Sequence, residues 1–176
     1  MNRRPADTEY AAAFYAAYVS LVPENDILPA LSGQSALLRR VADSIPEERE
    51  TFRYAPEKWS VREVIGHVVD LERVFGFRAF AFSRGETAPL PGFDEKVYVA
   101  HSGYDRRSLE SLAGDFTNVR EANLSFLRRL DAEAWDRVGT ANGKPVSVRA
   151  LAYVMAGHAR HHLSILRERY GVGASA

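Results

Sequence analysis

The chain has 176 residues, 46% of them hydrophobic, which is enough to bury one core. Its 23 basic and 23 acidic side chains cancel, which argues against a nucleic acid or a membrane surface as partner. Cysteine is absent, which excludes a disulfide framework, a thiolate metal site and a cysteine nucleophile. Any metal ion must therefore bind histidine or carboxylate, and any thiol chemistry must use an external thiol.

We expect a single domain over residues 1–176, with its core between about residues 26 and 170. The first residues, 1–7, are not followed by the apolar stretch of a signal peptide. The sequence also lacks a run of about 18 apolar residues, the minimum for a transmembrane helix. These features predict a cytoplasmic protein.

Two segments precede Pro46. Residues 9–21 are rich in alanine and tyrosine, and they fit a short helix or an extended lead-in equally well. Residues 26–44 predict a helix, because Asp26 suits an N-cap and apolar side chains recur at helical intervals. Pro46 ends this helix, since proline cannot continue it.

The next helix has the clearest start in the sequence. Residues 60–63, Ser-Val-Arg-Glu, fit a capping box with Ser60 as N-cap and Glu63 reaching back from N3. We expect this helix to run from Val61 to about Phe82. Residues 83–107 then contain five glycines and prolines without a sustained period, which predicts a long connection. A connection of this length in a compact bundle usually covers a binding site.

Two more helices and a hairpin complete the prediction. Residues 108–130 show an apolar face of helical period, and residues 148–169 show another. Between them, Asn142-Gly143 predicts a tight β-hairpin, although Pro145 weakens its second arm. The chain is therefore expected to be all-α, an antiparallel four-helix bundle with a long connection between its second and third helices.

The last helix places two histidines among apolar side chains. With His158 as origin, His162 and several apolar residues fall on one face at about 100° per residue; these are Leu151, Val154, Met155 and Ile165. A spacing of four residues lets both rings turn a nitrogen toward one ion. Two buried imidazoles on an aliphatic stripe also need partners to offset desolvation, and a shared metal ion would serve both.

A third candidate ligand, His67, lies at the edge of the apolar stripe of the second helix. Its ring could meet the pair from the last helix, or it could be an ordinary hydrogen-bonded core histidine. Three neutral imidazoles would leave a coordination position open for water or substrate. Zinc, nickel, iron(II) or manganese would accept such ligands, and imidazole alone does not select among them.

Several other polar and aromatic residues could have either a functional or a structural role. Asp70 could orient His67 or accept a proton from metal-bound water, or it could be a solvated helix acid. His101, in the long connection, could approach the metal or stay exposed. His161 is expected to be a partly exposed neighbour of the ligands. Four aromatic residues could wall a pocket or simply pack: Trp59, Phe93, Tyr98 and Tyr104.

One acid is expected inside the core. Glu72 falls on the apolar side of its helix, so burial would require a cationic partner. Arg39, Arg40 or Arg73 could supply that cation, and a structural ion pair is the preferred interpretation.

Three stretches of this sequence resemble the DinB-like metalloproteins. Residues 54–67, continuing through Asp70 and Glu72, resemble the second-helix signature of that family, and residues 157–162 resemble its last-helix signature. Residues 84–94 are similar to a loop of one branch. The resemblance spans about residues 26–170. It implies a four-helix fold, metal ligation by the three histidines named above, and a homodimer.

The resemblance also implies a range of functions. Better understood relatives transfer or use a low-molecular-weight thiol such as bacillithiol, mycothiol or glutathione, and others are called metal-dependent hydrolases. We therefore expect a metal-dependent enzyme that transfers an external thiol to a small electrophile. The alternatives are a hydrolase that uses metal-bound water, with Asp70 or His101 as base, and a non-catalytic metal-binding dimer in stress response.

Overall fold

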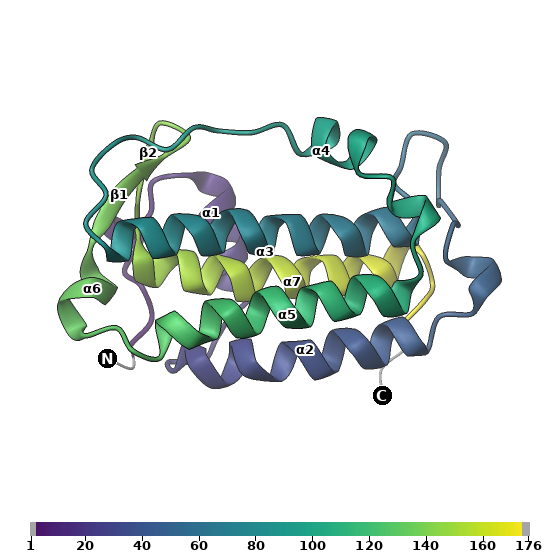
Figure 1. The fold of residues 1–176 in the computed structure, drawn as a ribbon, viewed down its shortest axis with the longest axis horizontal. Helices are drawn as coiled ribbons and strands as arrows, with labels where there is room; N and C mark the ends of the chain where they lie inside the picture. The colour runs from purple at the N-terminus through teal and green to yellow at the C-terminus, as the bar shows by residue number, and fades with distance from the viewer. Residues whose placement is uncertain (1–2, 174–176) are drawn as a thin grey trace.

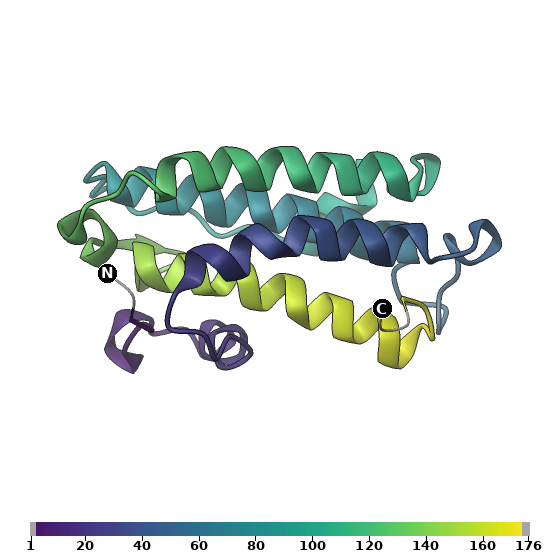
Figure 2. The same cartoon turned by 90° about the horizontal axis from the view of Figure 1, so that it is seen from below.

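The computed structural model describes residues 3–173, which form a four-helix bundle with short additions (Figures 1 and 2). This confirms the predicted fold class. Each long helix ends within about three residues of its expected limits. The four are α2 (Ile27–Asp43), α3 (Val61–Ser83), α5 (Leu109–Leu127) and α7 (Val148–Arg169).

The directions in which the four long helices run explain why the connection between α3 and α5 is long. Helix α3 runs antiparallel to α7, and α2 runs antiparallel to α5, but α3 and α5 point the same way (Figure 1). Accordingly, Gly66 near the start of α3 lies against Tyr104 just before α5. Residues 84–108 must therefore return along the whole of α3, which is about 35 Å long at 1.5 Å per residue. The connection is long because it joins two parallel neighbours.

Side chains cap the helices as the sequence predicts. Asp26 accepts a hydrogen bond from the backbone N–H of Leu28 at 3.2 Å. Ser60 Oγ accepts from the N–H of Glu63 at 3.1 Å, and the Glu63 carboxylate accepts from the N–H of Ser60 at 2.9 Å. The capping box that positions the start of α3 is confirmed.

Two short helices lie outside the four long ones. One decides the open prediction for residues 9–21, and the other corrects the prediction for the long connection. Within residues 9–21, α1 (Ala13–Ser20) is a helix, and it packs against α7. Within the connection, α4 (Glu95–Ser102) replaces part of the expected irregular chain. Asp94 caps α4 and Gly103, at φ 67°, ends it. Eight residues are too few to show a helical period in sequence, so α4 was missed.

The predicted hairpin is present before α7. Strands β1 (Val138–Ala141) and β2 (Lys144–Ser147) pair antiparallel after the short α6 (Ala132–Asp136). The turn residues Asn142 and Gly143 have φ of 51° and 70°, as a two-residue hairpin turn requires. Leu90, in the connection, bridges to Ala141, so the hairpin also anchors one end of that connection.

A buried polar network joins three of the bundle helices. Arg120 of α5 donates to both carboxylate oxygens of Glu72 at 2.8 Å, and it also donates to Gln34 of α2 at 2.7 Å. The predicted ion pair of Glu72 exists, but the expected partners Arg39, Arg40 and Arg73 were wrong. The register of α3 against α5, which local sequence does not encode, selects Arg120. Among the helices of residues 3–173, none is long and apolar enough to cross a membrane.

Candidate metal centre

Three histidines converge between α3 and α7. His67 comes from α3, while His158 and His162 lie one turn apart on α7. One ring nitrogen from each lies within 4.8 Å of the other two, and the Nε2 atoms of His67 and His158 are 3.1 Å apart. The ring centroids are separated by 4.5 to 4.9 Å. The structure therefore brings together the three residues that the sequence selected as ligands.

All three rings are buried, with exposed fractions of 2%, 3% and 8% for His67, His158 and His162. Burial lowers the pKa of His67 to about 4, and the neighbouring His161 adds to this effect. Burial likewise holds the pKa values of His158 and His162 well below 6.5. The rings are thus neutral at physiological pH, which is the form of imidazole that binds a metal ion.

The donor set fits one divalent ion. Nitrogens bound at 2.0–2.1 Å to a tetrahedral zinc ion are about 3.3 Å apart, so small ring rotations would bring this cluster to ligation distance. The buried Nδ1 atoms of His67 and His162 have no hydrogen-bond partner among the described residues. Buried nitrogens without partners are costly, and ligation would satisfy any that turns toward the ion.

Aromatic side chains surround the cluster. Trp59, next to the α3 cap, lies 4.7 Å from His67 between ring centroids. Tyr18 of α1 meets the ring of His158 edge-on at 5.3 Å. Glycine at position 157 permits this approach, because a Cβ there would lie 2.0 Å from the Tyr18 carbonyl oxygen. Helix α1 thus forms part of the site, although residues 9–21 fitted a short helix and an extended lead-in equally well.

Two cavities adjoin the histidines. A cavity of about 290 Å³ is lined by His158, and one of about 500 Å³ is lined by His162. Glu95, the first residue of α4, lines both, and Lys96 lines the second. The connection between α3 and α5 therefore contributes walls to both cavities. A small molecule in either would lie beside a histidine of the cluster.

The remaining candidates occupy different places. Asp70 accepts a hydrogen bond from Tyr104 Oη at 2.6 Å and lies 3.4 Å from Arg73. Burial, with the Asp70 carboxylate, raises the pKa of Tyr104. His101 is exposed on α4, where its Nδ1 pairs with the Val97 carbonyl oxygen at 2.9 Å. His161 is half-buried, as expected, and packs on Tyr18 at 5.6 Å.

The aromatic wall is only partly the expected one. Trp59 lines the cavity at His162 and Phe93 lines the cavity at His158, whereas Tyr98 lines a separate groove along α3 and Tyr104 is buried against Gly66. Several charged residues that line the cavities were not singled out from the sequence, among them Arg78, Glu95 and Lys96. Position 78 continues the apolar stripe of α3 through Leu71 and Phe75, so an arginine there was a detectable signal.

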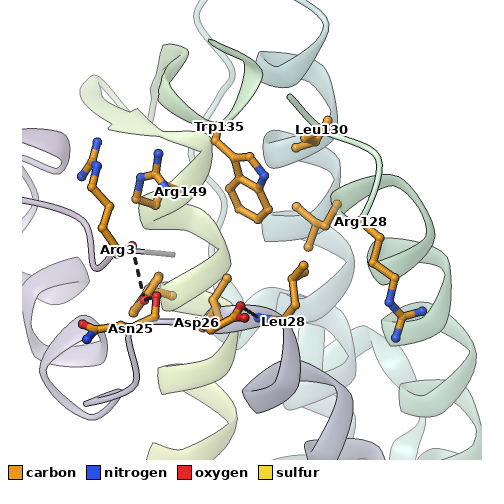
Figure 3. Close-up of a pocket in the computed structure, with 11 residues that line it drawn as sticks. Arg3, Asn25, Asp26, Leu28, Arg128, Leu130, Trp135 and Arg149 are labelled. Atoms are coloured by element: carbon orange, nitrogen blue, oxygen red, sulfur yellow. Dashed lines mark hydrogen bonds between the residues drawn. The ribbon is translucent and has the colours of Figure 1, made fainter. Parts of the chain in front are cut away.

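A further cavity, of about 180 Å³, lies away from the histidines near the start of α2 (Figure 3). Trp135 and Arg149 lie across it from Asp26 and Leu28 (Figure 3). None of its lining residues belongs to the histidine cluster. The chemistry of the centre therefore concerns the other two cavities.

Residues 30–166 match the model of the DinB superfamily. No curated protein matches the sequence significantly. Among solved structures, YfiT from Bacillus subtilis superposes with a TM-score of 0.71 at 15% identity, over 96% of this chain and 95% of its own. YfiT is described as a probable metal-dependent hydrolase with an unusual four-helix bundle topology.

A mycothiol-dependent maleylpyruvate isomerase also has this fold. It superposes with a TM-score of 0.65 at 14% identity and covers 92% of this chain, but this chain spans only 64% of the isomerase. The family match extends over most of the bundle and includes all three clustered histidines. The chain belongs to the DinB superfamily.

Proposed function

We propose that this protein is a metal-dependent enzyme in which His67, His158 and His162 hold one divalent ion. The proposed reaction transfers a low-molecular-weight thiol to a small electrophile. The observation that carries the proposal is the convergence of three buried, neutral imidazoles beside two cavities. Zinc, nickel, iron(II) and manganese all suit these ligands. We also propose a cytoplasmic location, where low-molecular-weight thiols are kept reduced.

The chain and the ion would have separate tasks. A bound divalent ion acts as a Lewis acid and lowers the pKa of a thiol or of water. The protein supplies the rigid ligand set, because α7 holds two rings one turn apart and the capped α3 presents the third. Trp59 and Tyr18 shield the rings from water. The absence of cysteine from the chain fits a thiol delivered by a co-substrate.

Asp70 has a different role in this proposal from the one suggested by its position in sequence. Its carboxylate already accepts from Tyr104 and pairs with Arg73. Tyr104 in turn packs against Gly66, the residue before His67. We infer that Asp70 holds the turn at Tyr104 against α3 and so positions His67 indirectly. In this proposal Asp70 does not take the proton of the nucleophile.

Hydrolysis is the second candidate function, because YfiT is described as a probable metal-dependent hydrolase. The same histidines would then hold an ion that activates water. The non-catalytic alternative has less support. A purely structural ion would be enclosed by protein, whereas two cavities of about 290 and 500 Å³ adjoin this cluster.

Cobalt substitution tests the thiol proposal. Protein purified without a histidine tag is loaded with cobalt(II) and titrated with cysteine, glutathione, bacillithiol and mycothiol. We expect at least one thiol to produce a sulfur-to-cobalt charge-transfer band in the near ultraviolet. His67→Ala should abolish the band, because one of three ligands is lost, whereas His101→Ala should retain it, since His101 is exposed on α4.

Two results would redirect the assignment. A cobalt-loaded protein whose spectrum is indifferent to every thiol, but which cleaves a chromogenic ester, would replace transfer with hydrolysis. Failure to bind cobalt, nickel or zinc at all would refute the metal centre itself.

A further inference from the structure

Three arginines are buried in the described part of the chain, and one of them differs from the other two. Arg78, Arg120 and Arg149 have exposed fractions of 3%, 0% and 4%. Arg120 pairs with Glu72, and Arg149 pairs with Asp136. Within residues 3–173, Arg78 forms no ion pair with a carboxylate. A buried guanidinium without an anion is the exception that calls for a ligand.

The partners of Arg78 are all uncharged. Its Nη2 donates to the carbonyl oxygen of Pro91 at 2.8 Å, and Nη1 lies at the long distance of 3.5 Å from Tyr15 Oη. Its guanidinium carbon lies 5.4 Å from the ring centre of Phe93. These contacts fix the side chain between α3 and the connection but do not neutralise its charge. Moving a cation out of water is costly unless an opposite charge compensates it.

Arg78 lines the same cavity as His158. The cavity measures about 290 Å³, and most of its other walls are aromatic or aliphatic; they include Phe14, Tyr18, Leu71, Phe75 and Phe93. The other charged wall residue is Glu95, which is exposed on α4. A cation and a candidate metal ligand thus line the same, largely apolar cavity. This composition suits a small molecule with an apolar body and an anionic end.

We propose that Arg78 binds the carboxylate of a small apolar acid in this cavity, with the other end of the molecule directed toward His158. A guanidinium suits a carboxylate because it can donate two parallel hydrogen bonds to the two oxygens. The orientation toward the histidines rests on the proposed function, but the carboxylate site itself does not. The acid could be the electrophile or the carboxylated part of the thiol.

A matched pair of probes tests the site without any metal ion. 3-Phenylpropionate and its neutral amide, 3-phenylpropanamide, differ only in the group that Arg78 would bind. Calorimetric titration of metal-free protein should show the acid binding at least about tenfold more tightly than the amide, as expected for a charge-assisted hydrogen-bonded pair. Arg78→Met should remove this preference, and Arg78→Lys should retain part of it. Arg39→Met, at an exposed position of α2, should leave it unchanged.

Circular dichroism and metal analysis of each variant separate this proposal from the proposed function. Equal binding of acid and amide by the unaltered protein would overturn the site, as would a preference that survives in a folded Arg78→Met variant. If that variant does not fold, Arg78→Lys replaces it: a reduced preference for the acid supports the site, and an unreduced one overturns it. If the unaltered protein binds no metal ion, the metal centre is refuted, but the carboxylate test is unaffected because it uses metal-free protein.

Competition identifies the source of the carboxylate. With zinc-loaded protein, displacement of 3-phenylpropionate by cysteine but not by cysteamine would support a site for the carboxylate of the thiol. Retention of the probe in the presence of both would support a site for the electrophile.

Discussion

At the scale of single residues, the centre depends on two imidazoles that share one face of α7. Each ring of the cluster contacts the other two, and His158 and His162 supply two of the three rings from this one helix. His161 lies three residues after His158 on the same helix; its ring packs on Tyr18 and on His162, but it does not belong to the possible ligand set. Substitutions of His158 and of His161 therefore provide a matched test of the ligand set.

His158→Ala should remove the divalent ion, because two imidazoles bind it too weakly to compete with water and buffer ligands. His161→Ala should keep one ion per chain, because its ring is not part of the cluster. Elemental analysis of dialysed protein measures both. Unchanged metal content in the first variant, or a loss confined to the second, would move the ligand set to other residues.

The stability of the metal-free protein should depend on pH through the same rings. The pKa of His67 is about 4 in the folded chain against an ordinary value of 6.5. Between these values the unfolded chain binds more protons, so the free energy of unfolding falls as pH falls from about 6.5 to about 4. At 1.36 kcal/mol per pKa unit, His67 alone accounts for about 3 kcal/mol. His158 and His162 act in the same direction.

Urea unfolding with a chelator present, at about pH 7.5 and about pH 5, measures the part of this loss that falls above pH 5, about 2 kcal/mol for His67. His67→Asn should reduce the difference between the two conditions, since asparagine does not titrate. A free energy of unfolding that is constant across this range would contradict buried, neutral rings.

At the scale of elements, α1 packs so closely on α7 that no side chain fits at position 157. A Cβ at position 157 would lie 2.0 Å from the carbonyl oxygen of Tyr18, and backbone cannot rotate away as a side chain can. By contrast, Gly33 in α2 has no atom within 4 Å of the position its Cβ would take. The two helical glycines should therefore respond in opposite ways.

Gly157→Ala should lower the free energy of unfolding by about 1–3 kcal/mol, the usual cost of overpacking, and should weaken metal binding by moving Tyr18 away from His158. Gly33→Ala should raise the free energy of unfolding by up to about 1 kcal/mol, because alanine is the better helix former. Chemical denaturation and zinc titration of both variants provide the check. Equal effects of the two substitutions would show that α1 does not press on α7 in solution.

Local signals were sufficient for the long helices and the hairpin, because caps, periodicity and the Asn142-Gly143 turn are each encoded within a few residues. They were insufficient for α4, because its eight residues are too few to show a helical period and because it also relies on contact with α3. The histidine cluster was predictable from one apolar face and a family resemblance. The partner of Glu72 was not, since Arg120 lies 48 residues away and only the helix register joins them.

At the scale of the whole molecule, the homodimer stays a prediction. The N-terminal segment leaves apolar surface for a second copy: Tyr15 is buried in this chain, but Phe14 and Leu21 have exposed fractions of 44% and 40%. Light scattering at micromolar concentration should give twice the chain mass of 19.6 kDa. Leu21→Glu should shift the mass toward one chain, and Val138→Glu, at the hairpin, should not. A mass near 19.6 kDa for the unaltered protein would refute the dimer.

The position of α7 also bears on how the protein is made. This helix packs against α1, α2 and α3, so segments from the beginning and the middle of the chain share it as a common neighbour. His67 must wait for residues 158 and 162, which follow it by about ninety positions, before the ligand set exists. On the ribosome, α1 and α3 would lack their main packing partner until α7 emerges. Metal loading should therefore follow the synthesis of α7, and chaperones that hold unfinished helices should contact this chain before then.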